Sequence, residues 1–200
     1  MREDVFDLTL QLLKELCNRG TQKEVNMNGN GESFLDPNLV DRVSRVKKVV
    51  GERQVCLSTN GINLTSEKVR SLKGVGLDRL DISPHSPFRA RKALEILRES
   101  GMGGVLNVGP IYSSHNWAGQ LEPEKSIRNV KRIMCIPLQE GRGYVQAEGT
   151  ISPCCYDFRN LGTFASVFDR NALDKPMSDF SLCKTCHQII DQQTMERMRS

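Results

Sequence analysis

The sequence predicts an α/β protein with a parallel sheet, followed by a smaller part that is rich in cysteine. In residues 1–110, apolar stretches with helical spacing alternate with short apolar runs of strand length. Strands that alternate with helices in this way pack into parallel sheets through right-handed crossovers. After Pro110 the alternation ends, and five of the seven cysteines follow it.

Four helices and four strands are expected before Pro110, because apolar residues recur there with periods typical of each element. The predicted helices are 4–18, 38–50, 66–73 and 88–100, and the predicted strands are 24–28, 55–58, 77–83 and 105–108. Residues 111–124 show no period and predict a linker or a long loop. Residues 144–151 predict a hairpin with Glu148 and Gly149 at its turn.

The composition is that of a globular protein, with 38% hydrophobic and 26% charged residues. No apolar run approaches the roughly 18 residues of a membrane helix, and the N-terminus lacks the pattern of a signal peptide. We therefore expect a cytoplasmic protein, in which grouped cysteines bind metal more often than they form disulfides. The net charge of +4 is spread along the chain and gives no basis for nucleic-acid binding.

Polar residues and glycines follow each predicted strand. These are Gly29–Glu32, Ser58–Gly61, Ser83–His85, and Asn107 with Gly109. Ligands of parallel sheets bind at the carboxyl ends of the strands, so these segments predict a ligand site. The alternative is that they only form turns.

The cysteines of the last third have the spacing of metal ligands. They are Cys135, Cys154 and Cys155 behind Pro153, and the pair Cys183 and Cys186. Such thiolates suit a tetrahedral zinc ion or an iron-sulfur cluster, and His187 is a further candidate ligand. The alternative is that they are ordinary buried cysteines, which is the interpretation favoured for Cys17 and Cys56 within apolar elements.

Taken together, the motifs resemble those of radical S-adenosylmethionine enzymes with a C-terminal SPASM or twitch domain. The motifs are residues 29–37, 57–61 and 80–83, then the cysteines together with Leu161 and Gly162. The resemblance implies a partial parallel (β/α) barrel in residues 1–124 and a small iron-sulfur domain in residues 125–200.

The resemblance also implies roles for particular residues. Asn30, Gly31 and Glu32 would hold the methionine amino group of S-adenosylmethionine, and Gly29 would belong to the same cofactor site. Ser58, Asn60 and Ser83 would face its carboxylate or ribose. Cys135, Cys154, Cys183 and Cys186 would bind an auxiliary 4Fe-4S cluster, with Cys155 as a neighbour or alternative ligand. The implied reaction is hydrogen abstraction from a peptide or a small metabolite.

Two features depart from the family pattern. Ser33 stands where the family commonly has proline, and the sequence lacks the Cys-x3-Cys-x2-Cys loop that binds the catalytic cluster. Met1 falls in what would be the helix directly after that loop. We therefore expect this polypeptide to be inactive in radical chemistry unless a companion chain or an upstream segment supplies the loop. The alternative is a non-catalytic iron-sulfur or zinc-binding protein that serves electron transfer or partner binding.

Overall fold

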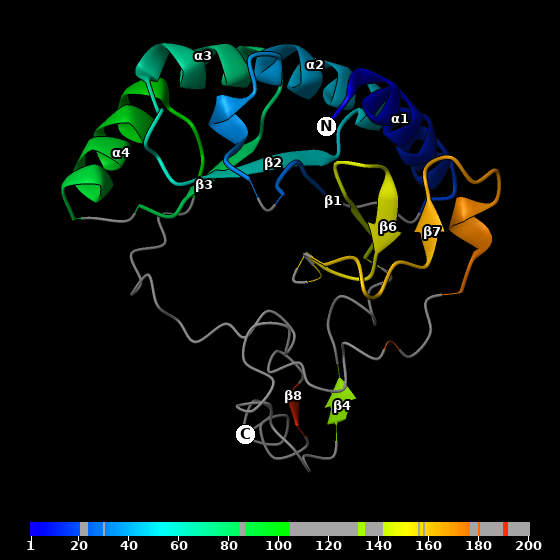
Figure 1. Ribbon diagram of the computed structural model, residues 1–200. Helices are drawn as coiled ribbons and strands as arrows, with labels where there is room; N and C mark the ends of the chain where they lie inside the picture. The colour runs from blue at the N-terminus through cyan, green and yellow to red at the C-terminus, as the bar shows by residue number, and fades with distance from the viewer. Residues whose placement is uncertain are drawn as a thin grey trace. The chain divides into compact units, whose positions relative to one another are not determined.

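The computed structural model describes residues 1–20, 24–29, 31–84, 87–104, 132–134, 142–155, 157, 159–176, 180 and 190–191. The chain divides into two compact units (Figure 1). One unit is Leu10–Ser113, and the other combines Met1–Thr9 with Ser114–Ser200. The predicted strand 105–108, the predicted linker and the predicted domain boundary near residue 124 lie outside the described residues.

The four predicted helices are confirmed. They are α1 (Glu3–Asn18), α2 (Leu39–Val50), α3 (Ser66–Gly74) and α4 (Pro87–Ser100). A short 3-10 helix, η1 (Ser33–Leu35), was not predicted. The start of α3 is fixed by Thr65, whose hydroxyl accepts a hydrogen bond from the Lys68 N–H at 3.2 Å. A threonine in this place satisfies a backbone donor that the helix leaves unpaired.

The predicted parallel sheet is also confirmed for three of its strands. These are β1 (Glu24–Asn26), β2 (Gln54–Thr59) and β3 (Arg79–Ile82), in the order β1-β2-β3. The third strand begins two residues later than predicted. At Asp78 it is the side chain, and not a backbone carbonyl, that accepts the hydrogen bond from β2. Its carboxylate accepts the Val55 N–H at 2.8 Å and the ammonium of Lys47 at 2.8 Å.

The core of this unit lies between the sheet and the helices α2 and α3 (Figure 1). Its buried side chains include Val43, Val46 and Val50 of α2, Val69 and Leu72 of α3, and Val55, Leu57, Leu80 and Ile82 of the sheet. Successive residues of a strand point to opposite faces. The residues between these apolar ones therefore lie on the other face, which is the face left for polar groups.

The second unit contains small antiparallel sheets. One is formed by β5 (Tyr144–Val145), β6 (Thr150–Ser152) and β7 (Ala165–Ser166), and the other pairs β4 (Arg132–Met134) with β8 (Ile190–Asp191). The first confirms the predicted hairpin.

Gly149 is needed in the turn of this hairpin, because it has a φ of +93° and its neighbours leave no room for a side chain. A Cβ there would lie 2.8 Å from Val167 Cγ2 and 3.3 Å from Cγ1 of Val5 in α1. The first residues of α1 thus belong to the packing around this turn.

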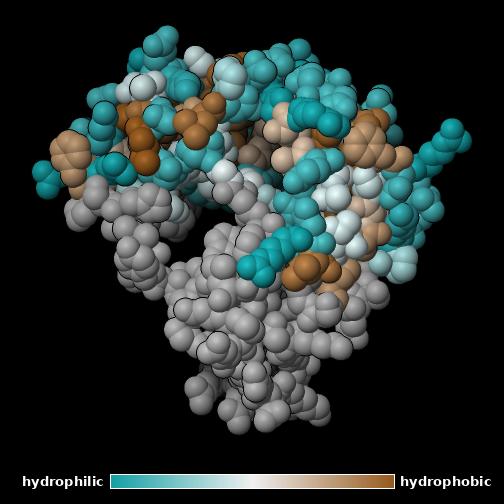
Figure 2. Space-filling view, viewed as in Figure 1, coloured by the Kyte–Doolittle hydropathy of each residue, from teal (hydrophilic) through white to brown (hydrophobic). Residues whose placement is uncertain are grey.

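The visible face of the described helices is mixed in hydropathy. In Figure 2, apolar residues on the visible face are interspersed with hydrophilic ones over the helices. Among the residues that the structure describes, no helix has the length and apolar content that crossing a membrane requires.

Candidate functional site

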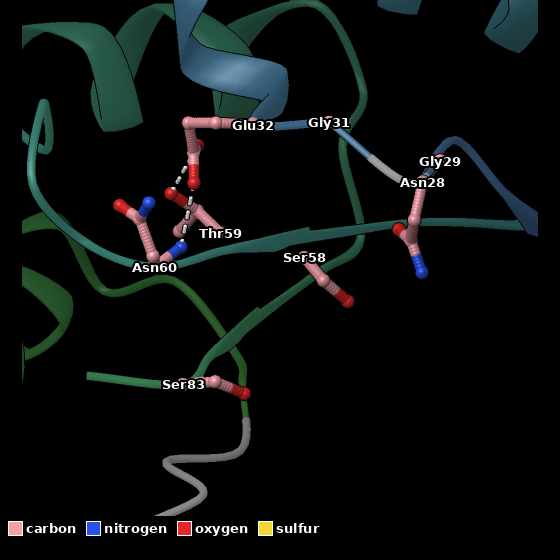
Figure 3. Close-up of a pocket in the computed structure, with 8 residues that line it drawn as sticks. All are labelled: Asn28, Gly29, Gly31, Glu32, Ser58, Thr59, Asn60 and Ser83. Carbon is pink, nitrogen blue, oxygen red and sulfur yellow. Dashed lines mark hydrogen bonds between the residues drawn. The ribbon is translucent and has the colours of Figure 1, made fainter. Parts of the chain in front are cut away.

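A pocket of about 310 Å³ opens at the carboxyl ends of β1, β2 and β3 (Figure 3). It is lined by Asn28, Gly29, Gly31, Glu32, Ser58, Thr59, Asn60 and Ser83. Its volume is at the lower end of the range for small-molecule sites. The structure thus brings together six of the seven residues that were predicted to bind a cofactor at the strand ends. The seventh, Asn30, lies outside the described residues, as do His85, Asn107 and Gly109.

The pocket side chains belong to two sides of the sheet. Asn28, Ser58 and Ser83 point to one side of β2, and Glu32 approaches Thr59 from the other (Figure 3). The alternation of residues along a strand explains why the neighbours Ser58 and Thr59 are separated in this way. The side with Asn28, Ser58 and Ser83 therefore offers polar groups from three successive strands.

Glu32 fastens the loop after β1 to the end of β2. One carboxylate oxygen, Oε1, accepts from the Phe34 N–H at 3.0 Å and from the Thr59 hydroxyl at 2.6 Å. The other, Oε2, accepts from the Asn60 N–H at 2.8 Å. Hydrogen bonds to an ionised carboxylate are stronger than those between neutral groups. Most of the hydrogen bonds that the Glu32 carboxylate can accept therefore come from the chain, and they hold the pocket loop in place.

Asn60 connects Glu32 to the turn that follows β2. Its backbone N–H donates to Glu32, and its side-chain oxygen accepts from the Ile62 N–H at 2.8 Å. An asparagine side chain that bonds the backbone two residues further on is typical of a tight turn. The sequence analysis predicted that Asn60 faces a bound cofactor. The structure shows that its side chain also stabilises this turn.

Asn28 is a pocket residue that the sequence analysis missed. Its side-chain oxygen is buried and has no hydrogen-bond partner within the described part of the chain. A buried acceptor without a donor costs free energy, so a ligand that donates a hydrogen bond would stabilise the site. The alternation of Glu24, Asn26 and Asn28 places all three on the polar face, and that pattern could have identified Asn28.

The polar face extends along the sheet below the pocket. The guanidinium of Arg79 bonds the Glu24 carboxylate at 3.2 Å and the Asp81 carboxylate at 3.2 Å, and Asn26 donates to Glu24 at 2.7 Å. Cys56, on the central strand between them, is fully buried. Burial, together with the negative charge of Glu24, raises the pKa of the Cys56 thiol to about 11, against the opposing effect of Arg79.

We expect Cys56 to stay a protonated thiol in the folded protein at pH 8.5. Iodoacetamide should then modify the exposed Cys155 and leave Cys56 unmodified until the chain unfolds, as peptide mass spectrometry can establish. Because the folded state holds the Cys56 proton up to about pH 11 and the unfolded state loses it near pH 9, stability should fall as the pH rises between these values. Modification of Cys56 at the same rate in the folded and unfolded protein would contradict this prediction.

The described part of the second unit contains two of the predicted metal-site cysteines. Cys154 is a half-buried cysteine after β6, and Cys155 is exposed. Cys135, Cys183, Cys186 and His187 lie outside the described residues. Within the residues that are described, no group of three or more histidine, cysteine or carboxylate side chains could hold a metal. The predicted ligand set therefore stays a prediction.

The parallel sheet with a polar pocket at its strand ends is an arrangement that suits a small-molecule ligand, and comparison with known proteins identifies the class. The family model of the radical SAM superfamily matches residues 1–108, so the chain belongs to the radical SAM superfamily.

The curated relatives are named GTP 3',8-cyclase. The enzyme from Limosilactobacillus fermentum is 37% identical over 101 residues, which cover 50% of this chain and 29% of the relative. The enzyme from Aquifex aeolicus is 32% identical over 98 residues, which cover 49% of this chain and 30% of the relative. The matched segment thus spans less than a third of either cyclase.

Solved structures of a protein named BtrN share the fold. The complex of BtrN with AdoMet and 2-DOIA gives a TM-score of 0.68 at 17% identity, and the match covers 100% of this chain and 77% of that chain. An open conformation of BtrN gives a TM-score of 0.64 at 14% identity, with 98% and 85% covered. The mixed α/β architecture is therefore shared with these structures.

Membership of the superfamily implies S-adenosylmethionine and a 4Fe-4S cluster as cofactors. The pocket fits the first of these, because an ammonium group donates hydrogen bonds and the Asn28 side-chain oxygen is an unmatched acceptor. For the catalytic cluster the sequence offers no corresponding set of ligands, since the 200 residues contain no Cys-x3-Cys-x2-Cys sequence.

Proposed function

We propose that this polypeptide binds S-adenosylmethionine in the strand-end pocket and an auxiliary 4Fe-4S cluster at its cysteines, as part of a radical enzyme. The enzyme would abstract a hydrogen atom from a peptide or a small metabolite. The observation that carries the proposal is the pocket itself, with polar groups from three successive strand ends and an unmatched buried acceptor at Asn28.

In the proposed complex, each side of the pocket has its own task. The ammonium group of S-adenosylmethionine donates to the Asn28 oxygen and to backbone carbonyls of the loop 29–31, which glycines leave open to a ligand. The hydroxyls of Ser58 and Ser83 meet its carboxylate or ribose, since a hydroxyl both donates and accepts. Glu32 keeps the loop in place through its three bonds to the chain.

When bound, S-adenosylmethionine would supply the 5'-deoxyadenosyl group for hydrogen abstraction, after one electron from a reductant had broken the bond between its sulfonium and C5' and released methionine. Delivery of that electron needs a catalytic cluster, for which these 200 residues provide no cysteine triplet. We therefore propose that the polypeptide alone does not cleave S-adenosylmethionine. A companion chain or a further segment of a longer protein would supply the triplet, with a separate electron donor.

The auxiliary cluster is proposed at Cys135, Cys154, Cys183 and Cys186. Its support is the soft thiolate set with a two-residue spacer in the last pair, which suits iron-sulfur ligation. The half-buried Cys154 is consistent with a ligand that is partly shielded from water. The barrel shape of the sheet and the SPASM or twitch character of residues 125–200 belong to the same proposal.

Binding of S-adenosylmethionine to the 200-residue chain tests the proposal and requires no catalytic cluster. Ligand-observed NMR, in which even weak binding changes the signals of the ligand, should show transfer of saturation from the protein to S-adenosylmethionine. Asn28→Ala should weaken binding about tenfold, equivalent to roughly 1.4 kcal/mol, because the ammonium loses an acceptor. Asn28→Asp, which keeps an acceptor and adds negative charge, should bind at least as well as the original chain.

Asn38→Ala is the matched control, because Asn38 is an exposed asparagine at the start of α2 whose side chain makes no capping bond. It should leave the binding curve unchanged. The absence of binding by the original chain would refute the proposed cofactor site. Equal binding by Asn28→Ala would refute the role of Asn28 within it.

A further inference from the structure

A lysine of α3 contacts the short helix that follows Glu32. Lys68 lies in the first turn of α3 and is half-buried, and its ammonium donates to the Phe34 carbonyl at 3.1 Å. The same ammonium lies 5.6 Å from the centroid of the Phe34 ring, which is within the range of a cation–π interaction. Phe34 itself is 2% exposed. Lys68 therefore connects α3 to a residue of η1 whose side chain belongs to the core.

Through Phe34 this contact reaches the strand-end pocket. The Phe34 N–H donates to Glu32 Oε1 at 3.0 Å, and the same oxygen accepts from the Thr59 hydroxyl at 2.6 Å. Glu32 Oε2 accepts from the Asn60 N–H at 2.8 Å. Glu32, Thr59 and Asn60 all line the pocket. A continuous series of contacts thus runs from the Lys68 ammonium to three residues of the pocket wall.

The far end of η1 has a contact of its own. Asp36, which follows η1, accepts from the guanidinium of Arg42 in α2 at 2.9 Å. Loss of the Lys68 ammonium would take a charged donor from the Phe34 carbonyl at the end next to the pocket, while the ion pair of Asp36 with Arg42 would remain. The expected consequence is a local loosening of the pocket loop and not a loss of the fold.

We propose that Lys68 is a positioning residue for S-adenosylmethionine, on which it acts through Phe34 and Glu32. The inference rests on the cofactor site of the proposed function. Lys68 is not among the residues that line the pocket, and its ammonium is engaged by the Phe34 carbonyl and ring. Hydrogen bonds from an ionised donor are about twice as strong as those between neutral groups, so this bond can hold a loop in position.

The test measures the affinity of the full 200-residue chain for S-adenosylmethionine by ligand-observed NMR. Lys68→Met keeps an apolar stem over Phe34 but removes the donor and the charge. It should weaken binding about fivefold, which is less than the full effect of one bond from a charged donor, because Glu32 keeps its other bonds. Amide hydrogen exchange at Phe34 and Asn60, whose N–H groups donate to Glu32, should become faster. Lys68→Arg, which supplies another cationic donor, should restore both quantities.

Lys73→Met is the matched control. Lys73 lies in the same helix, and its ammonium also donates to backbone carbonyls, those of Ser100 at 3.2 Å and Gly101 at 2.7 Å. Neither carbonyl belongs to a residue that lines the pocket. The two methionine variants should have similar midpoints in urea, whereas only Lys68→Met should weaken binding and speed exchange at Phe34. If Lys68→Met fails to fold, Lys68→Gln replaces it and should show the same loss, because its amide is neutral and shorter.

The outcomes separate failure of the inference from failure of the proposed function. Absence of S-adenosylmethionine binding by the original chain would overturn both. Binding by the original chain, with equal affinity in Lys68→Met or an equal loss in Lys73→Met, would overturn the inference alone. Unchanged exchange at Phe34 and Asn60, or failure of Lys68→Arg to restore affinity, would also overturn it. Selective weakening in Lys68→Met with faster exchange, and recovery in Lys68→Arg, would support the inference.

Discussion

Glu32→Ala should lower the free energy of unfolding by about 3 kcal/mol and abolish measurable binding of S-adenosylmethionine. The substitution leaves the Phe34 and Asn60 N–H groups and the Thr59 hydroxyl without their acceptor. Each unsatisfied group in a partly buried place costs roughly 1–3 kcal/mol, although some regain water. Urea denaturation gives the first quantity, and ligand-observed NMR gives the second.

Glu99→Ala is the control for this change. The Glu99 carboxylate accepts an exposed hydrogen bond from the Ser66 hydroxyl at 3.0 Å, and Glu99 is not among the residues that line the pocket. It should change stability by less than about 1 kcal/mol and leave binding intact. If Glu32→Ala binds S-adenosylmethionine as well as Glu99→Ala does, the loop that Glu32 fastens is not part of the site.

Gly104→Ala should destabilise the sheet by about 3 kcal/mol, at the upper end of what overpacking costs. The Leu80 N–H donates to the Gly103 carbonyl at 3.0 Å, so residues 103 and 104 run directly beside β3. A Cβ on Gly104 would lie 2.0 Å from the Leu80 carbonyl oxygen and 3.0 Å from its carbon. Because backbone atoms cannot turn aside as a side chain can, the chain must move away from β3.

Two alanine variants serve as controls in the same urea experiment. Gly103→Ala brings its Cβ to 3.5 Å from the Asp78 carbonyl oxygen, which is ordinary contact and should be tolerated. Gly74→Ala, in the last turn of α3, meets no atom within 4 Å and should stabilise the helix by about 0.5–1 kcal/mol. A Gly104→Ala midpoint equal to that of Gly103→Ala would show that β3 does not need this close approach.

Periodicity was sufficient to predict the four helices and the three described strands of the first half, although not the short helix η1. Apolar spacing placed all four helices, and the parallel sheet followed from their alternation with the strands. Six of the predicted pocket residues are adjacent in space because the carboxyl ends of parallel strands lie at one edge. These are consequences of local pattern and of fold geometry, which a sequence contains.

The direction and partner of a polar side chain could not be predicted in this way. The sequence analysis assigned Glu32 to cofactor binding. In the structure its carboxylate accepts hydrogen bonds from three groups of the chain itself. The burial of Asp157 was not predicted, because an acidic residue between Tyr156 and Phe158 gives no sign of burial. Periodicity likewise does not say which core a helix joins: Val5 continues the apolar stripe of α1, yet it packs beside Gly149 of the second unit.

The packing of Val5 beside Gly149 limits which fragments of the protein can fold. The compact unit that holds the hairpin needs residues from both ends of the sequence, Met1–Thr9 and Ser114–Ser200. A fragment expressed from residue 125 onward would lack Val5, and the apolar groups of Val167 and Phe168 near the turn would lose a neighbour. A fragment meant to isolate the cysteine-bearing unit should therefore include the first nine residues as well, joined by an engineered linker.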